Sequence, residues 1–344
     1  MTTMTSGDGW RAPSLRAHVN RIAELTINVS DLERSRLFYE SLTPLRMLRR
    51  TETPTQAFPS LGLERGRFVG YLMADGSSGQ PGVVVHLVQW LDPEPVGTAY
   101  PTFFHRGLYR LCFLTDHLAE RYEHAVAQGH APFRPPRGHG IPVPGGSEGL
   151  SFVCPDPDGV AVQTTRRPAP WRDDLPDQLY HVNIVSSEID RSRAFLQDVV
   201  GLDYVKRLTL PGPVGPIGFG KGAEEGQFDA AFLWHRGDRR FSVDIVNWFV
   251  PGVIGEPYPS PLNLGIQRLA LEVDDLDAAL AALLAQIPAE LQDSVRGPDT
   301  WDLGDGLTRR VVLFRDHDGV GYELVEQQPY VGARSAPWPP EAFD

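Results

Sequence analysis

The chain has 344 residues, of which 41% are hydrophobic and 22% charged, a composition typical of a globular protein of about two domains. Its formal net charge of −12 argues against nucleic acid as the main partner, because phosphate binding needs a basic face. No apolar run approaches the ~20 residues that span a bilayer, and the N-terminus lacks the hydrophobic stretch of a signal peptide. We therefore expect a cytoplasmic protein with a small-molecule partner and no membrane contact, and a homodimer is the candidate assembly.

The first structural unit begins after a polar N-terminal segment, residues 1–17, which we expect to be a flexible tail. Ile22–Val29 alternates apolar and polar residues, which predicts a half-buried strand. Ser30-Asp31-Leu32-Glu33 has the spacing of a capping box and predicts a helix that continues to about Ser41. Three strands separated by Pro- and Gly-rich breaks complete the order β-α-β-β-β: Leu45–Arg50, Arg67–Met73 and Val83–Trp90.

A second unit repeats this order. Tyr109–Leu114 predicts a strand and Ala119–Gln128 a helix, followed by a Pro- and Gly-rich loop over residues 132–149. Two further strands, Leu150–Cys154 and Val160–Thr165, flank a hairpin turn formed by Asp156-Pro157-Asp158-Gly159. The two cysteines, Cys112 and Cys154, lie in apolar segments and are expected to be buried, reduced thiols.

The second half of the chain duplicates the first. Residues that recur 158 positions later include Trp90 as Trp248, Tyr100 as Tyr258 and Arg110 as Arg268. A near-constant offset along the chain indicates duplication of a domain-sized unit. We therefore predict domains at 18–166 (modules 18–97 and 107–166) and 179–328 (modules 179–255 and 265–328), joined by a linker at 167–178 and followed by a tail at 329–344.

Modules 1 and 3 begin with Glu24 or His181 followed by alternating hydrophobic residues, and modules 2 and 4 close on Asp-x-Asp-Gly followed by Gln163 or Glu323. Four such modules in tandem resemble the vicinal oxygen chelate superfamily, which includes glyoxalases, bleomycin- and fosfomycin-resistance proteins and extradiol ring-cleaving dioxygenases. The resemblance covers about residues 18–328. It implies an α+β fold in which four βαβββ modules form two cupped, barrel-like mixed sheets with the helices outside.

The resemblance also implies a metal inside each cup, held by side chains from the first and last strands of paired modules. The corresponding positions here are Glu24, Arg110, His181 and Arg268 on first strands and His86, Gln163, Asp244 and Glu323 on last strands. If adjacent modules pair, the primary metal site is His181, Asp244 and Glu323, and a weaker secondary site is Glu24, His86 and Gln163. If the first module pairs with the fourth, the sets become Glu24, His86, Arg268 and Glu323, and Arg110, Gln163, His181 and Asp244. The expected ion is divalent, with Fe(II) favoured over Mn(II), Ni(II) or Zn(II).

An arginine at one position of each set departs from the family pattern, because a guanidinium is always protonated and cannot bind a cation. Arg110 and Arg268 would instead clamp an anionic oxygen of the substrate, or neutralise carboxylates in a site that has lost its metal. Two more residues are candidates: His235 as a general base at the mouth of a cup, and Trp248 as a substrate contact. The loops Thr51–Gly66 and Pro211–Gly222 are expected to cover the cups.

Three functions follow as hypotheses. The leading one is a metal-dependent, dioxygenase-like oxidoreductase acting on a catechol- or hydroxyquinone-like molecule chelated through two oxygens. The alternatives are a glyoxalase-like lyase or isomerase working through an enediolate, and a non-catalytic protein that binds a small antibiotic molecule.

Overall fold

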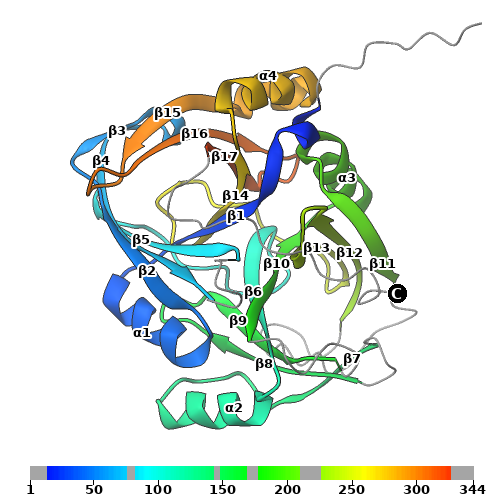
Figure 1. Cartoon of the computed structure of the whole chain (residues 1–344). Helices are drawn as coiled ribbons and strands as arrows, with labels where there is room; N and C mark the ends of the chain where they lie inside the picture. Colours follow the sequence, from blue (N-terminus) through cyan, green and yellow to red (C-terminus); the bar gives the residue numbers. More distant parts are fainter. Residues whose placement is uncertain (1–13, 76–81, 143–147, 169–176, 210–225, 327–344) are drawn as a thin grey trace, which may run out of the picture.

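The computed structural model of the chain describes residues 14–75, 82–142, 148–168, 177–209 and 226–326. The predicted loop at 211–222, the tail at 329–344 and most of the linker lie outside these residues. Four modules are arranged as two curved sheets with helices on the outside (Figure 1), the fold class that the resemblance indicated. One boundary needs correction: residues Leu15–Ala17, expected within a flexible tail, form the short helix η1, and Leu15 is fully buried.

The modules share one order of elements. Module 1 comprises β1 (Val19–Asn28), α1 (Leu32–Leu42), β2 (Arg46–Glu52), β3 (Gln56–Phe58), η2 (Pro59–Leu61), β4 (Leu63–Ala74) and β5 (Val84–Asp92). Module 2 comprises β6 (Gly107–Thr115), α2 (Leu118–Ala127), β7 (Arg137–Pro142), β8 (Glu148–Pro155) and β9 (Ala161–Arg166). Module 3 comprises β10 (Gln178–Val185), α3 (Ile189–Ala194), η3 (Phe195–Val200), β11 (Asp203–Thr209), β12 (Gln227–His235) and β13 (Asp238–Val250). Module 4 comprises β14 (Gly265–Val273), α4 (Leu276–Gln286), η4 (Ala289–Ser294), β15 (Arg296–Asp302), β16 (Thr308–Arg315) and β17 (Gly321–Glu326).

Module pairing follows the second of the two groupings that the sequence left open. One sheet has the order β15-β16-β17-β14-β1-β5-β4-β2, with β3 beside β4, and joins modules 1 and 4. The other has the order β11-β12-β13-β10-β6-β9-β8-β7 and joins modules 2 and 3. At each junction the first strands of two modules lie antiparallel, β1 against β14 and β6 against β10. Each half of the chain therefore contributes one module to each sheet.

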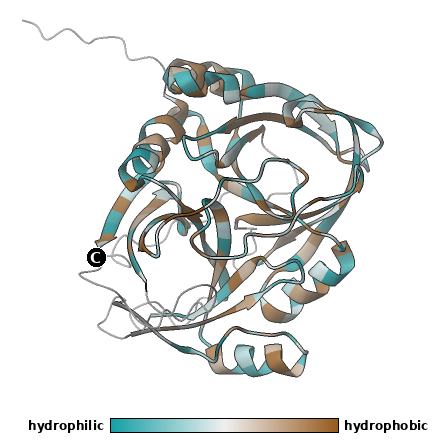
Figure 2. Cartoon of the chain, turned by 180° about the vertical axis from the view of Figure 1, so that it is seen from behind, coloured by the Kyte–Doolittle hydropathy of each residue, from teal (hydrophilic) through white to brown (hydrophobic). Residues whose placement is uncertain are grey.

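The central strands are buried on both faces. Because their side chains alternate, one face of each sheet carries apolar residues and the other face carries the buried polar ones. In β1, Leu25 and Ile27 point into a continuous hydrophobic core that includes residues of both sheets and all four α-helices. Glu24 and Thr26 point to the opposite face, which also carries aromatic rings such as Phe68. The concave face of each sheet is thus where buried polar groups gather. In Figure 2 the outer helices carry both hydrophilic and hydrophobic stretches, consistent with helices that cover this core.

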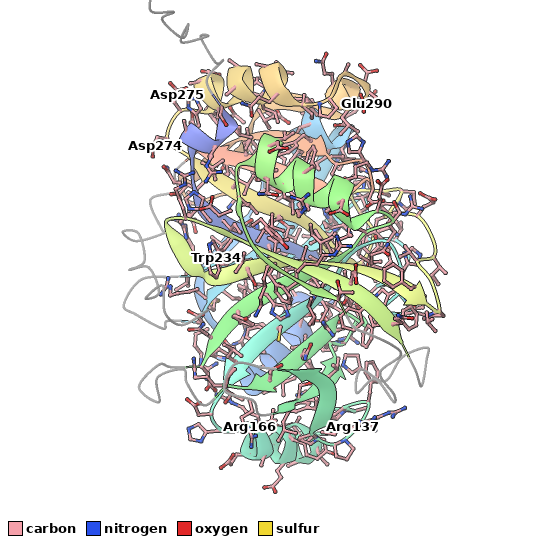
Figure 3. The ribbon with its side chains drawn as sticks, turned by 90° about the vertical axis from the view of Figure 1, so that its right-hand side faces the viewer. Arg137, Arg166, Trp234, Asp274, Asp275 and Glu290 are labelled. Atoms are coloured by element: carbon pink, nitrogen blue, oxygen red, sulfur yellow. The ribbon has the colours of Figure 1, made fainter. Side chains whose placement is uncertain are left out.

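Local sequence signals explain where the helices begin. Asp31 caps α1 by accepting a hydrogen bond from the Arg34 backbone, and Asp275 caps α4 in the same way through Ala278. The predicted cap residue Ser30 instead hydrogen-bonds to Asp158 of the neighbouring module. In Figure 3, Asp275 and Arg166 mark opposite ends of the molecule.

The predicted Asp156–Gly159 turn is confirmed. It joins the antiparallel strands β8 and β9, and Gly159 has a φ of 96°, a conformation that glycine adopts without strain. The short strand β3 and strand β7, which lies within the predicted 132–149 loop, were not predicted. Cys112 and Cys154 are buried free thiols, as expected. No α-helix in the described part of the chain is both long and apolar enough to span a membrane.

Candidate functional site

The eight predicted ligand positions gather into two clusters, one on the concave face of each sheet. Register places Thr26 of β1 opposite both His86 and Arg268, and Ala270 opposite both Glu24 and Glu323. We call Glu24, His86, Arg268, Arg309 and Glu323 the module 1–4 cluster. In the other sheet, Asn183 of β10 lies opposite both Arg110 and Asp244, and Cys112 lies opposite both Gln163 and His181. We call Arg110, Gln163, His181 and Asp244 the module 2–3 cluster.

This arrangement corrects the primary metal site expected for adjacent pairing. His181 and Asp244 stay together on β10 and β13, but Glu323 lies on β17 in the other sheet. The secondary set is divided too, because Glu24 and His86 lie in one sheet and Gln163 in the other. The physical reason is the strand order, which places β14 rather than β6 beside β1.

The module 1–4 cluster is a network of ion pairs, in which Glu323 Oε1 and Arg309 Nε are buried without a hydrogen bond among the described residues. Arg309 of β16 donates a bidentate pair of hydrogen bonds to Glu24, at 2.8 and 2.7 Å. Its Nη1 also lies 3.7 Å from Oε1 of Glu323, whose Oε2 accepts a hydrogen bond of 3.0 Å from Nε of Arg268. His86 completes the network, with Nδ1 3.3 Å from Glu24 and Nε2 3.1 Å from the Thr51 hydroxyl. Sequence reasoning missed Arg309.

The positive charges of Arg268 and Arg309 balance the negative charges of the two carboxylates in this network. This balance changes the pKa of Glu24. Burial alone would raise the pKa of Glu24, but the positive charge of Arg309 and the neighbouring His86 outweigh it and hold that pKa well below its ordinary value. Glu323 and Arg309 are 0% and 2% exposed. The carboxylates already have cationic partners, and a metal ion among them would face two guanidinium charges. The residues of the module 1–4 cluster therefore do not fit a divalent metal.

The module 2–3 cluster has fewer internal partners. His181 Nδ1 lies 3.5 Å from Oδ2 of Asp244, and within the described chain neither ring nitrogen of His181 makes a well-formed hydrogen bond. The side-chain oxygen of Gln163 is likewise buried without a hydrogen-bond partner among the described residues. Asp244 accepts one hydrogen bond of 3.0 Å from Ser242, and Arg110 donates one of 2.9 Å from Nε to Asn183.

Burial disfavours charge on both acid–base groups of this cluster. It lowers the pKa of His181 well below its ordinary value, with the positive Arg110 adding to the effect and the neighbouring Asn183 side chain opposing it. Burial raises the pKa of Asp244 to about 7, against a hydrogen bond from Ser242 and the attraction of Arg110.

A divalent cation would fit the donor set of this cluster. A neutral imidazole nitrogen, a carboxylate and an amide oxygen are all ligands that such ions accept. The unpaired atoms of His181 and Gln163 are the observation in favour. The described residues hold no group of three or more His, Cys, Asp or Glu side chains placed to bind a metal, so the third ligand here would be the amide oxygen of Gln163.

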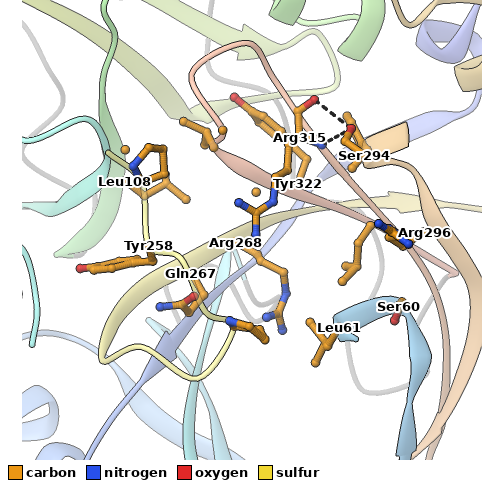
Figure 4. Close-up of a pocket in the computed structure, with 18 of the residues that line it drawn as sticks. Ser60, Leu61, Leu108, Tyr258, Gln267, Arg268, Ser294, Arg296, Arg315 and Tyr322 are labelled. Atoms are coloured by element: carbon orange, nitrogen blue, oxygen red, sulfur yellow. Dashed lines mark hydrogen bonds between the residues drawn. The ribbon is translucent and has the colours of Figure 1, made fainter. Parts of the chain in front are cut away.

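A cavity of about 460 Å³ opens beside the module 1–4 cluster (Figure 4). Its walls come from η2, the loop around Tyr258 and strands β14, β16 and β17. Arg268 is shared, since it lines the cavity and also hydrogen-bonds to Glu323. Part of the Thr51–Gly66 loop, expected as a cover, forms β3 and η2, and η2 contributes to the wall.

The two remaining candidates, His235 and Trp248, are engaged in contacts that stabilise the fold. Nε2 of His235 lies 3.0 Å from the carbonyl oxygen of Val19, and Nδ1 accepts a hydrogen bond of 3.1 Å from the backbone of Gly237. Both nitrogens are thus occupied at the β12–β13 hairpin, and the structure does not bring His235 into either cluster. Trp248 is buried against Phe104 and Phe228 within an aromatic cluster of modules 2 and 3.

Comparisons with known proteins agree with this fold. Residues 21–164 match the family model described as the Glyoxalase/Bleomycin resistance protein/Dioxygenase superfamily. A putative lactoylglutathione lyase of Brassica oleracea var. gemmifera is 23% identical over 319 residues, covering 90% of this chain and 93% of the relative. Glyoxalase I of Zea mays has a similar fold, with a TM-score of 0.62 and 18% identity over 89% of this chain and 92% of that chain. A putative dioxygenase of Bacillus subtilis aligns with a TM-score of 0.56 and 13% identity over 91% of this chain and 86% of that one.

Residues 21–164 therefore match the superfamily that the motifs indicated, and the fold of the whole chain is similar to that of solved members. The family model covers the first two modules, and the fold extends the same module to the second half of the chain. The two solved structures are similar in fold to this chain, and the lyase relative is similar in sequence over nearly its full length.

Proposed function

We propose that the chain is a metal-dependent lyase or isomerase acting on a small molecule, with its reacting centre at the module 2–3 cluster. The observation that carries the proposal is His181, a buried imidazole whose ring nitrogens lack a well-formed hydrogen bond within the described chain and whose Nδ1 lies 3.5 Å from Asp244. A buried polar atom without a partner is costly, so its persistence suggests that something absent from the protein chain satisfies it.

His181, Asp244 and the side-chain oxygen of Gln163 would hold the ion. When bound, a divalent metal supplies Lewis-acid polarisation of substrate oxygens. Fe(II), Mn(II), Ni(II) and Zn(II) are all compatible with this mixed nitrogen and oxygen set, and the structure gives no reason to keep Fe(II) ahead of the others.

Arg110 contributes a fixed positive charge beside these groups. Its guanidinium is held by Asn183 and lies over the Tyr109 ring, with Cζ 5.3 Å from the ring centroid. A guanidinium fixed in this way would bind and orient an anionic oxygen of the substrate. Asn183 and Tyr109 would act as positioning residues.

Lyase or isomerase chemistry is favoured over ring cleavage for two reasons. The His181, Asp244 and Glu323 set on which the dioxygenase hypothesis relied does not assemble. The curated relatives are named lactoylglutathione lyases, one of them at 23% identity over 90% of this chain. The catechol dioxygenase hypothesis consequently moves behind the lyase hypothesis.

The test is an assay for formation and cleavage of lactoylglutathione, run on the whole chain and on two matched amide variants. Asp244→Asn should abolish activity, because it removes the negative ligand of the module 2–3 cluster. Glu323→Gln should keep most of it, since Glu323 lies in the other cluster. Loss of activity in Glu323→Gln with a fully active Asp244→Asn would refute the assignment of the centre.

A further inference from the structure

The cavity beside Arg268 has features that the proposed reaction does not use. Most of its strand residues belong to the sheet of modules 1 and 4, with Gly107 and Leu108 added from β6, and neither His181 nor Asp244 lines it. Its volume of about 460 Å³ falls within the range of small-molecule pockets, roughly 300–1,000 Å³. It can therefore be considered as a separate binding site.

Positive charge dominates the lining. Arg268, Arg296 and Arg315 face the cavity, against one acidic residue, Asp293 (Figure 4). Within the described part of the chain, the side chains of Arg296 and Arg315 form no ion pair. A basic lining is notable in a chain whose net charge is −12. A concave site lined by one sign of charge concentrates ligands of the opposite sign.

Apolar groups form much of the remaining wall. Leu61 of η2, Leu108, Ile266 and Leu313 line it together with the ring of Tyr258. The Tyr258 ring is fixed by stacking on Tyr100, with centroids 4.0 Å apart. A ligand that matches this surface has a charged end for the arginines and an apolar or aromatic body for the wall.

No metal is needed to hold such a ligand. In the module 1–4 cluster, Arg309 already neutralises Glu24 and lies 3.7 Å from Glu323, so both carboxylates below the cavity have a guanidinium beside them. Arg268 connects the two regions, with Nε bound to Glu323 and its side chain on the cavity wall. Its position is fixed by that hydrogen bond, which orients the guanidinium before any ligand arrives.

We propose that this cavity binds a small organic anion, a carboxylate or phosphate ester with an apolar body, through Arg268, Arg296 and Arg315 and without a metal ion. The site is a second ligand site of the chain, distinct from the module 2–3 cluster.

Calorimetric titration of the whole, chelator-treated chain tests the proposal with three probes of similar size: benzoate, phenyl phosphate and neutral benzamide. At least one of the two anions should bind, benzamide should not, and added salt should weaken the binding. The tighter of the two anions tells whether the site prefers a carboxylate or a phosphate.

Arg296→Gln and Arg315→Gln should each weaken anion binding about tenfold, the order expected for losing one charged hydrogen bond. Both residues are exposed, so the variants should fold normally. The matched control is Arg166→Gln, an exposed arginine at the end of β9 in the other sheet, which should leave the affinity unchanged. His181→Ala should also bind the anion normally, which separates this site from the proposed reaction.

The proposal is overturned if neither anion binds. It is also overturned if benzamide binds as tightly as benzoate, or if Arg296→Gln and Arg315→Gln bind the anion as the unmodified chain does.

Discussion

Arg309 donates two parallel hydrogen bonds to Glu24 across 285 residues of sequence, joining the fourth module to the first. Both side chains are almost completely buried, and Glu24 is one of the positions at which the resemblance predicted a metal ligand. A guanidinium thus supplies the positive charge that balances the carboxylates of the module 1–4 cluster.

Breaking this pair should be costly. Arg309→Met leaves two buried carboxylates without their shared cation, and we expect a loss of about 3–5 kcal/mol in the free energy of unfolding, measured with urea. The double variant Glu24→Gln/Arg309→Met should lose less than the two single losses combined. The matched control is the neighbouring Arg310→Met: Arg310 forms partly exposed ion pairs with Asp277 and Glu326, and its loss should cost under about 1 kcal/mol. Equal costs for the two arginine variants would contradict the role given to Arg309.

Stability should also depend on pH through Glu24. Its folded-state pKa is held below the ordinary value of 4.5, so the unfolded chain binds the proton more readily. The stabilisation is fully present above that ordinary value and is lost as the pH falls below it. Urea unfolding between about pH 6 and about pH 3, a range that spans ordinary carboxyl pKa values, should show this loss, and Glu24→Gln should show a shallower decline. An unchanged slope in Glu24→Gln would show that other carboxyls govern acid unfolding.

Measuring the metal content of variants should show which of the two clusters binds a metal ion. We expect no more than one divalent ion for each chain after purification and dialysis, measured by elemental analysis. His181→Ala and Asp244→Asn should lose it, because they remove ligands of the module 2–3 cluster. Glu24→Gln should retain it, since that carboxylate is bound to Arg309. Two ions per chain, or loss of the ion in Glu24→Gln, would contradict this division.

The two duplicated tyrosines form a symmetric contact that should be measurable. The Tyr100 hydroxyl accepts a hydrogen bond of 3.1 Å from the backbone of Tyr258, and the Tyr258 hydroxyl accepts one of the same length from the backbone of Tyr100. Tyr100→Phe and Tyr258→Phe should each cost about 1 kcal/mol in unfolding free energy, and by similar amounts, because each leaves one backbone N–H without its acceptor. Tyr71→Phe is the control: the Tyr71 hydroxyl makes only an exposed contact of 3.4 Å with Glu33 and should cost less than about 0.5 kcal/mol. Very different costs for the two variants would mean that the contact is not symmetric in solution.

The sequence by itself determined the module and its repetition. Alternation in β1 and the Asp156–Gly159 turn are local signals, and each follows from interactions within a few residues. The resemblance to a known superfamily placed Glu24 and His181 at ligand positions. Alternation of side chains along a strand is consistent with that placement, because it keeps such positions on one face of the sheet.

Only the tertiary structure decided which modules share a cup. Because of the duplication, β6 and β14 carry the same residues at equivalent positions, Gly107 with Gly265 and Arg110 with Arg268. In the sequence, β1 therefore has two similar potential partner strands. The choice depends on strand pairing between residues more than 200 positions apart, which no local pattern encodes. The same holds for Arg309: it is buried beside Glu24 while its neighbour Arg310 is partly exposed, because burial is set by the face of β16 that meets the other strands.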